Sequence, residues 1–386
     1  MPEDLALGKS GLFWSSRPRM LLENLGISRT LPPRRAGRDK VEEQLINILN
    51  ASGETELNKV REKARELIVP LDAAKEFQQL DSLIGALLGT HASGKLHTRM
   101  GQLVAAGTPV DAERMTRFNA LANALRSTVV PAITDTAPSG AAQINFAFLE
   151  SYFSNYVEGT KFSIEEAEEI VLKNKIITNR PKDSHDVLGV FKIATTPRYR
   201  ATLPAPGEPF VAGLLERHRL MLENRPEANP GELKLEMNYA GTTEFVAPGL
   251  VRGTLQESST IALSIPEGLA RAIFYAFSIA EVHPFTDGNG RTSRLIMNAE
   301  LSRVGNSRII IPTLYHPQYI DCLKALTKDN DPRPFIKAIV QMARWSAEFE
   351  YSLLPDLLKA MTVSNAFEES PTRFKLKNAD GSALRG

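Results

Sequence analysis

The sequence predicts a mainly α-helical protein with one short β-hairpin. Apolar residues recur at helical spacing from about 41 to 128, and again from 264 to about 358, with Gly, Ser and Pro between the segments. Apolar and polar residues alternate instead around 233–246, "LKLEMNYAGTTEFV", which is typical of a hairpin. Hydrophobic residues make up 42% of the chain and charged residues 24%, as in ordinary globular proteins.

The 386 residues are enough for one large domain or two ordinary ones. Residues 1–40 are rich in Pro and Arg, which predicts an extended N-terminal arm. A helical N-terminal region follows over 41–135, and the loop "ITDTAPSGAAQ" is the best boundary to a larger domain over 140–350. The polar residues 360–386 are predicted to form a flexible tail.

Charge and composition argue against several partners. The net charge of +1 gives no general attraction to nucleic acid or to an anionic membrane. No apolar run reaches the length of a membrane span, and the first residues lack the layout of a signal peptide. The lone Cys322 cannot form an internal disulfide. We therefore expect a soluble, cytoplasmic protein that binds neither nucleic acid nor membranes.

Two helices flank the most polar motif of the chain. "SIPEGLARAIFYAFSIAEV" predicts a buried helix that begins with a capping box of Ser264 and Glu267. This helix must end near His283, because a residue that precedes proline avoids the helical conformation. "GRTSRLIMNAELSRV" predicts a second helix that begins near Asn289 or Gly290 and ends at Gly305.

The loop between them, "HPFTDGNGRTSR" over 283–294, suits an anion. Gly288 and Gly290 let the backbone adopt unusual conformations and let a ligand approach closely. Free N–H groups at the start of the second helix attract negative charge. Arg291 and Arg294 are three residues apart, so they share a helix face behind that site, and guanidinium groups bind phosphate oxygens in a fork.

The same loop carries a metal ligand and a base. Asp287 supplies a hard oxygen, which suits Mg²⁺ held jointly with substrate phosphates. His283 is the side chain here that accepts a proton near neutral pH. A phosphate site, a metal ligand and a base together predict transfer of a phosphorus-containing group to a hydroxyl.

These twelve residues resemble, without departure, the signature of the Fic (Fido) family, His-Pro-Phe-x-Asp/Glu-Gly-Asn-Gly-Arg-x-x-Arg. The resemblance implies a Fic-type helical core and a nucleotidyltransferase that moves AMP from ATP to a Ser, Thr or Tyr hydroxyl of a target protein and releases pyrophosphate. It implies that His283 is the catalytic base and that Asp287 holds Mg²⁺. It further implies a structural anchor at Phe285 and phosphate binding by the remaining motif residues, Gly288, Asn289, Gly290, Arg291 and Arg294.

A second stretch, "SNYVEG" over 154–159, resembles the inhibitory motif of the same family, Ser/Thr-x-x-x-Glu-Gly/Asn. A helix predicted over 144–159 ends here, and Ser163 and Glu166 form a capping box for the next helix. The resemblance implies autoinhibition by an N-terminal intramolecular helix, in which Glu158 pairs with Arg294 and takes the place of the γ-phosphate. The motif residues are Ser154, Glu158 and Gly159. The alternative is an ordinary surface helix end.

The hairpin falls where Fic proteins place a flap that pairs with the target segment. This resemblance implies target docking by Asn238, Gly241, Thr242 and Thr243, with a solvated hairpin as the alternative. Tyr315, His316 and Tyr319 either line an adenosine pocket, as similar tyrosines do in relatives, or pack in the core.

The implied partners are ATP and a protein with a hydroxyl side chain, the chain itself included, and a homodimer is among the assemblies left open. Three other activities stay open. The first is removal of AMP from a target, with Glu158 as the base for water. The second is another Fic transfer at the same site, phosphocholination or phosphorylation. The third is a non-catalytic interaction module, against which the intact motif argues.

Overall fold

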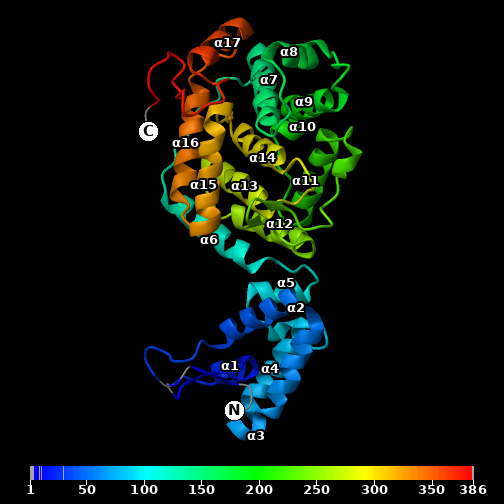
Figure 1. Cartoon of the computed structure of the whole chain (residues 1–386), viewed down its shortest axis with the longest axis vertical. Helices are drawn as coiled ribbons and strands as arrows, with labels where there is room; N and C mark the ends of the chain where they lie inside the picture. Colours follow the sequence, from blue (N-terminus) through cyan, green and yellow to red (C-terminus); the bar gives the residue numbers. More distant parts are fainter. Residues whose placement is uncertain (1–3, 8, 10, 29, 385–386) are drawn as a thin grey trace. The chain divides into compact units, whose positions relative to one another are not determined.

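The computed structural model describes residues 4–7, 9, 11–28 and 30–384. Helices dominate this part of the chain, and its sheets are two antiparallel pairs of two-residue strands, so the predicted mainly α class is confirmed. The chain divides into two compact units, Met1–Ala112 and Glu113–Gly386 (Figure 1). The division falls earlier than the loop at 133–143, so helix α6 (Ala112–Ser127) lies almost wholly in the second unit.

The first unit is a helical layer around a leucine-rich core. Its helices are α1 (Arg17–Leu25), α2 (Arg38–Glu66), α3 (Ile68–Leu71), α4 (Ala74–Leu87) and α5 (Arg99–Ala105). Strands β1 (Leu5–Ala6) and β2 (Phe13–Trp14) pair before them. The prediction of an extended arm over 1–40 is wrong where α1 forms, because Leu21, Leu22 and Leu25 provide an apolar face that the core buries. Residues 1–3, 8, 10 and 29 of the arm lie outside the described part.

The second unit holds every residue of the predicted site. Its helices continue with α7 (Gly140–Tyr156), α8 (Ile164–Lys173), α9 (Pro181–Thr195), α10 (Pro197–Arg200), α11 (Glu208–Met221), α12 (Pro248–Ala262), α13 (Leu269–Val282), α14 (Asn289–Arg303), α15 (His316–Asp329), α16 (Arg333–Ala347) and α17 (Leu354–Val363). The predicted hairpin is present as β3 (Tyr239–Ala240) and β4 (Thr243–Glu244), with Tyr239 paired to Glu244.

Helices α13 and α14 form the centre of this unit, and they pack on each other (Figure 1). Nearly all residues of both helices are buried. Helix α13 is mostly apolar, whereas α14 also buries polar side chains that bond neighbouring elements, among them Arg291, Arg294 and Asn298. The predicted end at His283 and start at Asn289 are confirmed. The predicted capping box is wrong: α13 begins at Leu269 after Gly268, and Ser264 bonds backward to the carbonyl of Ile261.

The C-terminal segment is folded where the sequence predicted a flexible tail over 360–386. Phe367 stacks on Phe153 of α7 with ring centres 5.3 Å apart, and Trp345 of α16 donates to the carbonyl of Lys377. Apolar side chains such as Phe367, which are few in this mostly polar segment, explain this packing. Residues 385 and 386 lie outside the described part. Within that part, the structure contains no helix with the length and apolarity that a bilayer span requires.

Candidate active site

The motif loop connects α13 to α14 through two left-handed residues. His283 follows the last turn of α13 with φ of 52°, and Gly288 precedes α14 with φ of 77°. The positive φ at position 288 favours glycine, and a Cβ there would also lie 2.8 Å from the flexible end of Met221. Asn289 closes the loop with its side-chain amide, which accepts from the N–H of Phe285 and donates to its carbonyl at 2.8 Å each.

The imidazole of His283 has a defined tautomer. Its Nδ1 lies 3.3 Å from the carbonyl of Ala280. A carbonyl only accepts, so Nδ1 carries the hydrogen and Nε2 keeps its lone pair. The ring stacks on Phe245 with centres 3.8 Å apart and planes 9° apart. Burial lowers the pKa of His283 to about 4, so the ring is neutral at physiological pH and can accept a proton.

Arg294 is held by the segment that the sequence predicted to be inhibitory. Its Nη2 lies 2.7 Å from Oε1 of Glu158 and 2.9 Å from the carbonyl of Ser154, and its Nε donates to Oγ of Ser154 at 3.0 Å. Burial opposes ionisation of Glu158, but the guanidinium of Arg294 outweighs it and holds the pKa of the carboxyl below its ordinary value. The guanidinium of Arg294, which the motif is expected to offer to a phosphate, is therefore paired with the charged carboxylate of Glu158.

Gly290 makes this contact possible. A Cβ at position 290 would lie 2.0 Å from Oε1 of Glu158. Any larger residue at the start of α14 would therefore displace the carboxylate. Gly159, with φ of 96°, follows Glu158 after the end of α7 and turns the chain away. The predicted capping box at Ser163 and Glu166 is confirmed, and it starts α8 directly after this turn.

Arg291 is also engaged, by Asp287 of the motif and by two residues outside it. Its Nη1 lies 3.2 Å from Asp186 of α9 and 3.2 Å from Oδ1 of Asn155, and its Nη2 lies 3.1 Å from Oδ2 of Asp287. Asp186 is itself buried and also bonds Arg225. Asp287 keeps 56% of its side-chain surface exposed. This single exposed carboxylate fits Mg²⁺, which proteins usually hold with one or two carboxylates and the substrate's phosphates. Among the described residues, no group of three or more acidic, His or Cys side chains is placed to bind a metal without such help.

His218 holds the motif loop in place by hydrogen bonding and by ring stacking. Its Nδ1 accepts from the N–H of Gly231 at 3.0 Å, so Nε2 carries the hydrogen and donates to the carbonyl of Asp287 at 3.0 Å. The ring stacks on Phe285 with centres 3.8 Å apart, and both rings are fully buried. Burial lowers the pKa of His218 to about 4. Phe285 is therefore packed in the core, as the resemblance implied.

The hairpin is fixed to the motif loop at its base. The backbone N–H of Lys234 donates to Pro284, and the side chain of Asn238 donates to the carbonyl of Phe285 at 3.0 Å. Lys234 is buried and donates to Oδ1 of Asn238 at 2.5 Å. Burial, together with the nearby charge of Arg114, lowers the pKa of its ammonium to about 8. Asn238 thus anchors the hairpin to the loop and does not face outward.

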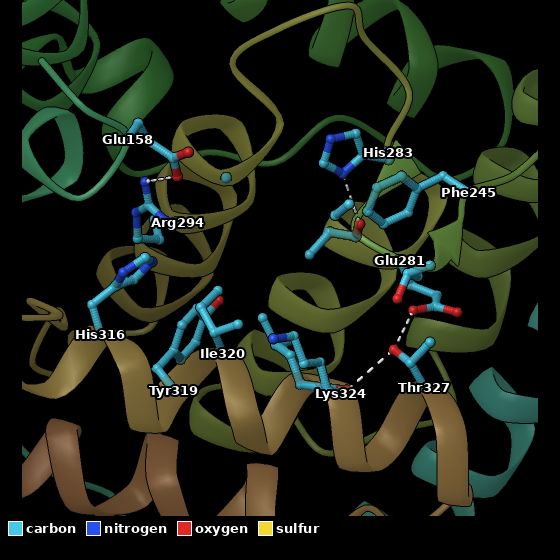
Figure 2. Close-up of a pocket in the computed structure, with 15 residues that line it drawn as sticks. Glu158, Phe245, Glu281, His283, Arg294, His316, Tyr319, Ile320, Lys324 and Thr327 are labelled. Atoms are coloured by element: carbon cyan, nitrogen blue, oxygen red, sulfur yellow. Dashed lines mark hydrogen bonds and ion pairs between the residues drawn. The ribbon is translucent and has the colours of Figure 1, made fainter. Parts of the chain in front are cut away.

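The tip of the hairpin lies between solvent and a cavity. Gly241 takes the turn with φ of 61°, and Thr242 is exposed. Thr243 and Ala240 line the cavity. His283, Arg294 and Glu158 line it as well (Figure 2). The full lining is Glu158, Ala240, Thr243, Phe245, Ala280, Glu281, His283, Gly290, Arg294, His316, Tyr319, Ile320, Leu323, Lys324 and Thr327. His316 and Tyr319 therefore face the cavity, as one of the two interpretations expected, whereas Tyr315 is buried and bonds Gln341.

A second carboxylate, Glu281, lies at the other end of this cavity (Figure 2). Its Oε1 is 2.7 Å from Arg117 and 3.4 Å from Arg114, both on α6, and its Oε2 accepts from Thr327 at 2.6 Å. Arg114 also donates to the carbonyl of Glu244 in the hairpin. Burial raises the pKa of Glu281, and the bonds from Thr327 and Arg117 oppose that rise.

Sequence reasoning missed four functional candidates. Asp186, His218 and Glu281 stand alone in the sequence on apolar helices, and only the packing brings them to the motif. Asn155 could have been found, since it is adjacent to Ser154 in the inhibitory motif. The sequence carried no signal for the others, because their contacts with Asp287, Arg291 and Thr327 span at least 46 positions along the chain.

Residues 211–301 match the model of the Fic/DOC family. The chain is 29% identical over 197 residues to protein adenylyltransferase Fic of Drosophila grimshawi, a match that covers 50% of this chain and 40% of the relative. It is 28% identical over 209 residues to protein adenylyltransferase Fic of Drosophila ananassae, covering 52% and 41%. The chain thus spans about two fifths of these relatives. Fic-1 from C. elegans has a similar solved structure, with a TM-score of 0.45, 19% identity, and coverage of 85% of this chain and 94% of that one.

The matched segment contains the hairpin and both motif arginines, and the curated relatives align over a stretch about twice as long. Residues 211–301 of the chain are therefore similar to the Fic/DOC family.

Proposed function

We propose that this chain is a protein adenylyltransferase that transfers AMP from Mg²⁺-ATP to a Ser, Thr or Tyr hydroxyl of a target protein. One observation carries the proposal: a neutral imidazole with a free Nε2 lines the same cavity as Arg294. A base for a hydroxyl and a cation for a triphosphate are thereby within one binding site. The names of the curated relatives support this activity.

The chemistry follows from the positions of these groups. Nε2 of His283 takes the proton of the target hydroxyl, and the hydroxyl oxygen attacks the α-phosphorus. The bond from the α-phosphorus to the bridging oxygen breaks, and pyrophosphate leaves. Arg294, Arg291 and the N–H groups at the start of α14 bind the β- and γ-phosphates and neutralise the charge that develops on the leaving group. A magnesium ion at Asp287 supplies further positive charge to the phosphates when bound.

We propose that the structure represents the inhibited form of this enzyme. Glu158 forms an ion pair with Arg294. Asn155 and Asp186 contact Arg291. A triphosphate must therefore compete with these side chains for both guanidinium groups. Release of Glu158 would open the site for the γ-phosphate. The exposed tip of the hairpin, Gly241 to Thr243, is the proposed docking point for the target segment.

The test is incubation with Mg²⁺ and ATP labelled on the α- or the γ-phosphate. We expect the Glu158→Gly variant to incorporate α label and not γ label, and Glu158→Gly with His283→Ala to incorporate at least about a hundredfold less, since general base catalysis contributes roughly 10²–10⁴-fold. Chelation of Mg²⁺ should have a similar effect. Label from the γ position would indicate phosphorylation instead, and no label in any variant would favour the interaction module.

Removal of AMP from a target is a second candidate, because Glu158 also lines the cavity with 32% of its side chain exposed. An ionised carboxylate there could accept a proton from water that attacks the α-phosphorus. A target labelled by Glu158→Gly and then given to the unsubstituted chain should lose its label if this activity exists. Persistent label would contradict it.

A further inference from the structure

Glu158 lies in a turn beyond the last residue of its helix. Helix α7 ends at Tyr156, and Glu158 and Gly159 follow before α8 begins at Ile164. The backbone N–H of Glu158 donates to the carbonyl of Asn155 at 3.1 Å, and Gly159 then takes a left-handed φ of 96°. The position of the Glu158 carboxylate therefore depends on the contacts that hold this turn on either side.

The C-terminal segment 364–384, which we call the C-terminal strap, makes contacts on both sides of Glu158. Oε1 of Glu369 accepts from the hydroxyl of Tyr156, and Oε2 of the same side chain lies 2.9 Å from Nζ of Lys161. Tyr156 is two residues before Glu158, and Lys161 is three residues after it. One carboxylate of the strap thus bonds both ends of the turn 156–161 that carries Glu158.

The bonding groups are in the charge states that these contacts need. The ammonium of Lys161 and the hydroxyl of Tyr156 hold the pKa of Glu369 below its ordinary value, so the carboxyl group is ionised. Burial and the bond to Glu369 raise the pKa of Tyr156 to about 12, so the hydroxyl keeps the hydrogen that it donates. Hydrogen bonds to an ionised acceptor are stronger than those between neutral groups, which favours a defined position for the turn.

The strap is itself held on both sides of Glu369. Before it, the ring of Phe367 stacks on Phe153 of α7, with ring planes 14° apart. After it, the backbone N–H of Lys377 donates to the carbonyl of Ser364 at 3.0 Å, which closes the strap into a loop. Glu369 therefore extends from a folded segment toward the turn, and the packing of that segment sets where its carboxylate lies.

We infer that the C-terminal strap controls the inhibition, and that Glu369 is the positioning residue that keeps Glu158 on Arg294. The inference rests on the proposed function and adds a second point of control to it, outside the motif and the cavity. A shift of residues 156–161 that withdraws Glu158 from Arg294 breaks the two bonds to Glu369. Displacement of the strap should therefore raise the transferase activity, although no residue of the motif changes.

The competing explanation is that Glu369 forms an ordinary surface contact. Exposed ion pairs contribute little to stability, and half of this side chain is exposed. The chain offers a matched pair of the same kind, because Lys182 and Glu227 lie 2.7 Å apart and are 54% and 51% exposed. The corresponding values for Lys161 and Glu369 are 54% and 50%. The two pairs differ in that only the second includes a residue of the turn 156–161.

The experiment measures the incorporation of label from α-labelled ATP into the chain itself. Glu369→Ala removes both bonds to the turn, and we expect it to raise incorporation by about fivefold, which is the effect of losing two partly exposed contacts. Glu369→Gln keeps an acceptor for Tyr156 and loses the charge that Lys161 pairs with, so it should raise incorporation by about twofold. Glu227→Ala, the matched control, should leave incorporation unchanged.

Two further measurements separate a positioning role from a merely structural one. In the Glu158→Gly variant, Glu369→Ala should change incorporation by less than about twofold, because the strap then has no carboxylate to position. Without Glu158→Gly, calorimetry should show that ATP binds Glu369→Ala about fivefold more tightly than it binds the unsubstituted chain, since Glu158 competes less for Arg294.

Three results would each overturn the inference: no rise in Glu369→Ala, an equal rise in Glu227→Ala, or the same rise with and without Glu158. The transferase itself stands in all three cases if Glu158→Gly incorporates label. No incorporation in Glu158→Gly would contradict the proposed function, and the change in ATP affinity then still decides whether Glu369 positions Glu158.

Discussion

Two carboxylate–guanidinium pairs face the same cavity, and their shortest N–O distances are both 2.7 Å. Glu281 and Arg117 are 3% and 12% exposed at their side chains, and a threonine binds the second carboxylate oxygen. Glu158 is 32% exposed and follows the end of α7, and among the described residues Arg294 is its one ion-pair partner. Equal distance therefore does not mean equal function. The first pair is enclosed and joins helices, whereas the second is partly open to solvent, so we expect a phosphate that competes for Arg294 to separate it.

Removing each carboxylate in turn and measuring the free energy of unfolding tests most directly whether the two pairs differ in function. Glu281→Ala should lower the free energy of unfolding by about 3 kcal/mol, because it leaves two largely buried guanidinium groups with only the exposed Glu113 as counter-charge. Glu158→Ala should lower it by about 1 kcal/mol or less, since Arg294 keeps its bonds to Ser154 and faces a cavity that water can enter. Urea unfolding of both variants decides this, and similar losses would show that both pairs are structural.

Acid should affect the phosphate end through His218. Its pKa is about 4 in the folded chain and about 6.5 when unfolded, so the unfolded chain binds more protons between these values. The contribution of His218 to stability should therefore be full above pH 6.5, and about 3 kcal/mol of it should be lost as the pH falls to 4, beside a similar loss from His283. In His218→Gln this part of the pH dependence should disappear. The matched control is His97→Gln, whose ring is 56% exposed, and it should leave the curve unchanged. Identical curves for the two variants would contradict the assignment.

Release of the inhibitory contact should have the next largest effect. Glu158→Gly should raise the rate of AMP incorporation by about a hundredfold, because a misplaced α-phosphate costs on that order. Glu281→Gln, which removes a carboxylate at the other end of the same cavity, should not raise it. Incorporation of label from α-labelled ATP into the chain itself measures both. A rise in Glu281→Gln, or none in Glu158→Gly, would show that Glu158 is not the residue that holds the site closed.

The mainly α class, the hairpin and the two central helices could be predicted from the sequence, because periodicity and helix-ending residues are local signals. The pairing of Glu158 with Arg294, implied by the family resemblance, is present in the structure. The capping box at Ser264 could not be judged locally, since the short turn before Gly268 competes with it. The folded conformation of the C-terminal segment could not be predicted locally either, because its Phe367 stacks on Phe153, more than two hundred positions earlier.

The composition of the motif can be read from the sequence alone: a histidine, an aspartate, glycines and two arginines within twelve positions, on a loop between two helices. Tertiary packing sets which side chains pair with Arg291 and Arg294, and which residues line the far end of the cavity. Asp186, His218 and Glu281 reach the site from α9, α11 and α13, and their partners come from segments distant in sequence. The reason is physical: a local pattern sets the conformation of a segment, whereas the charge and hydrogen-bond partners of a buried group depend on which segments pack against it.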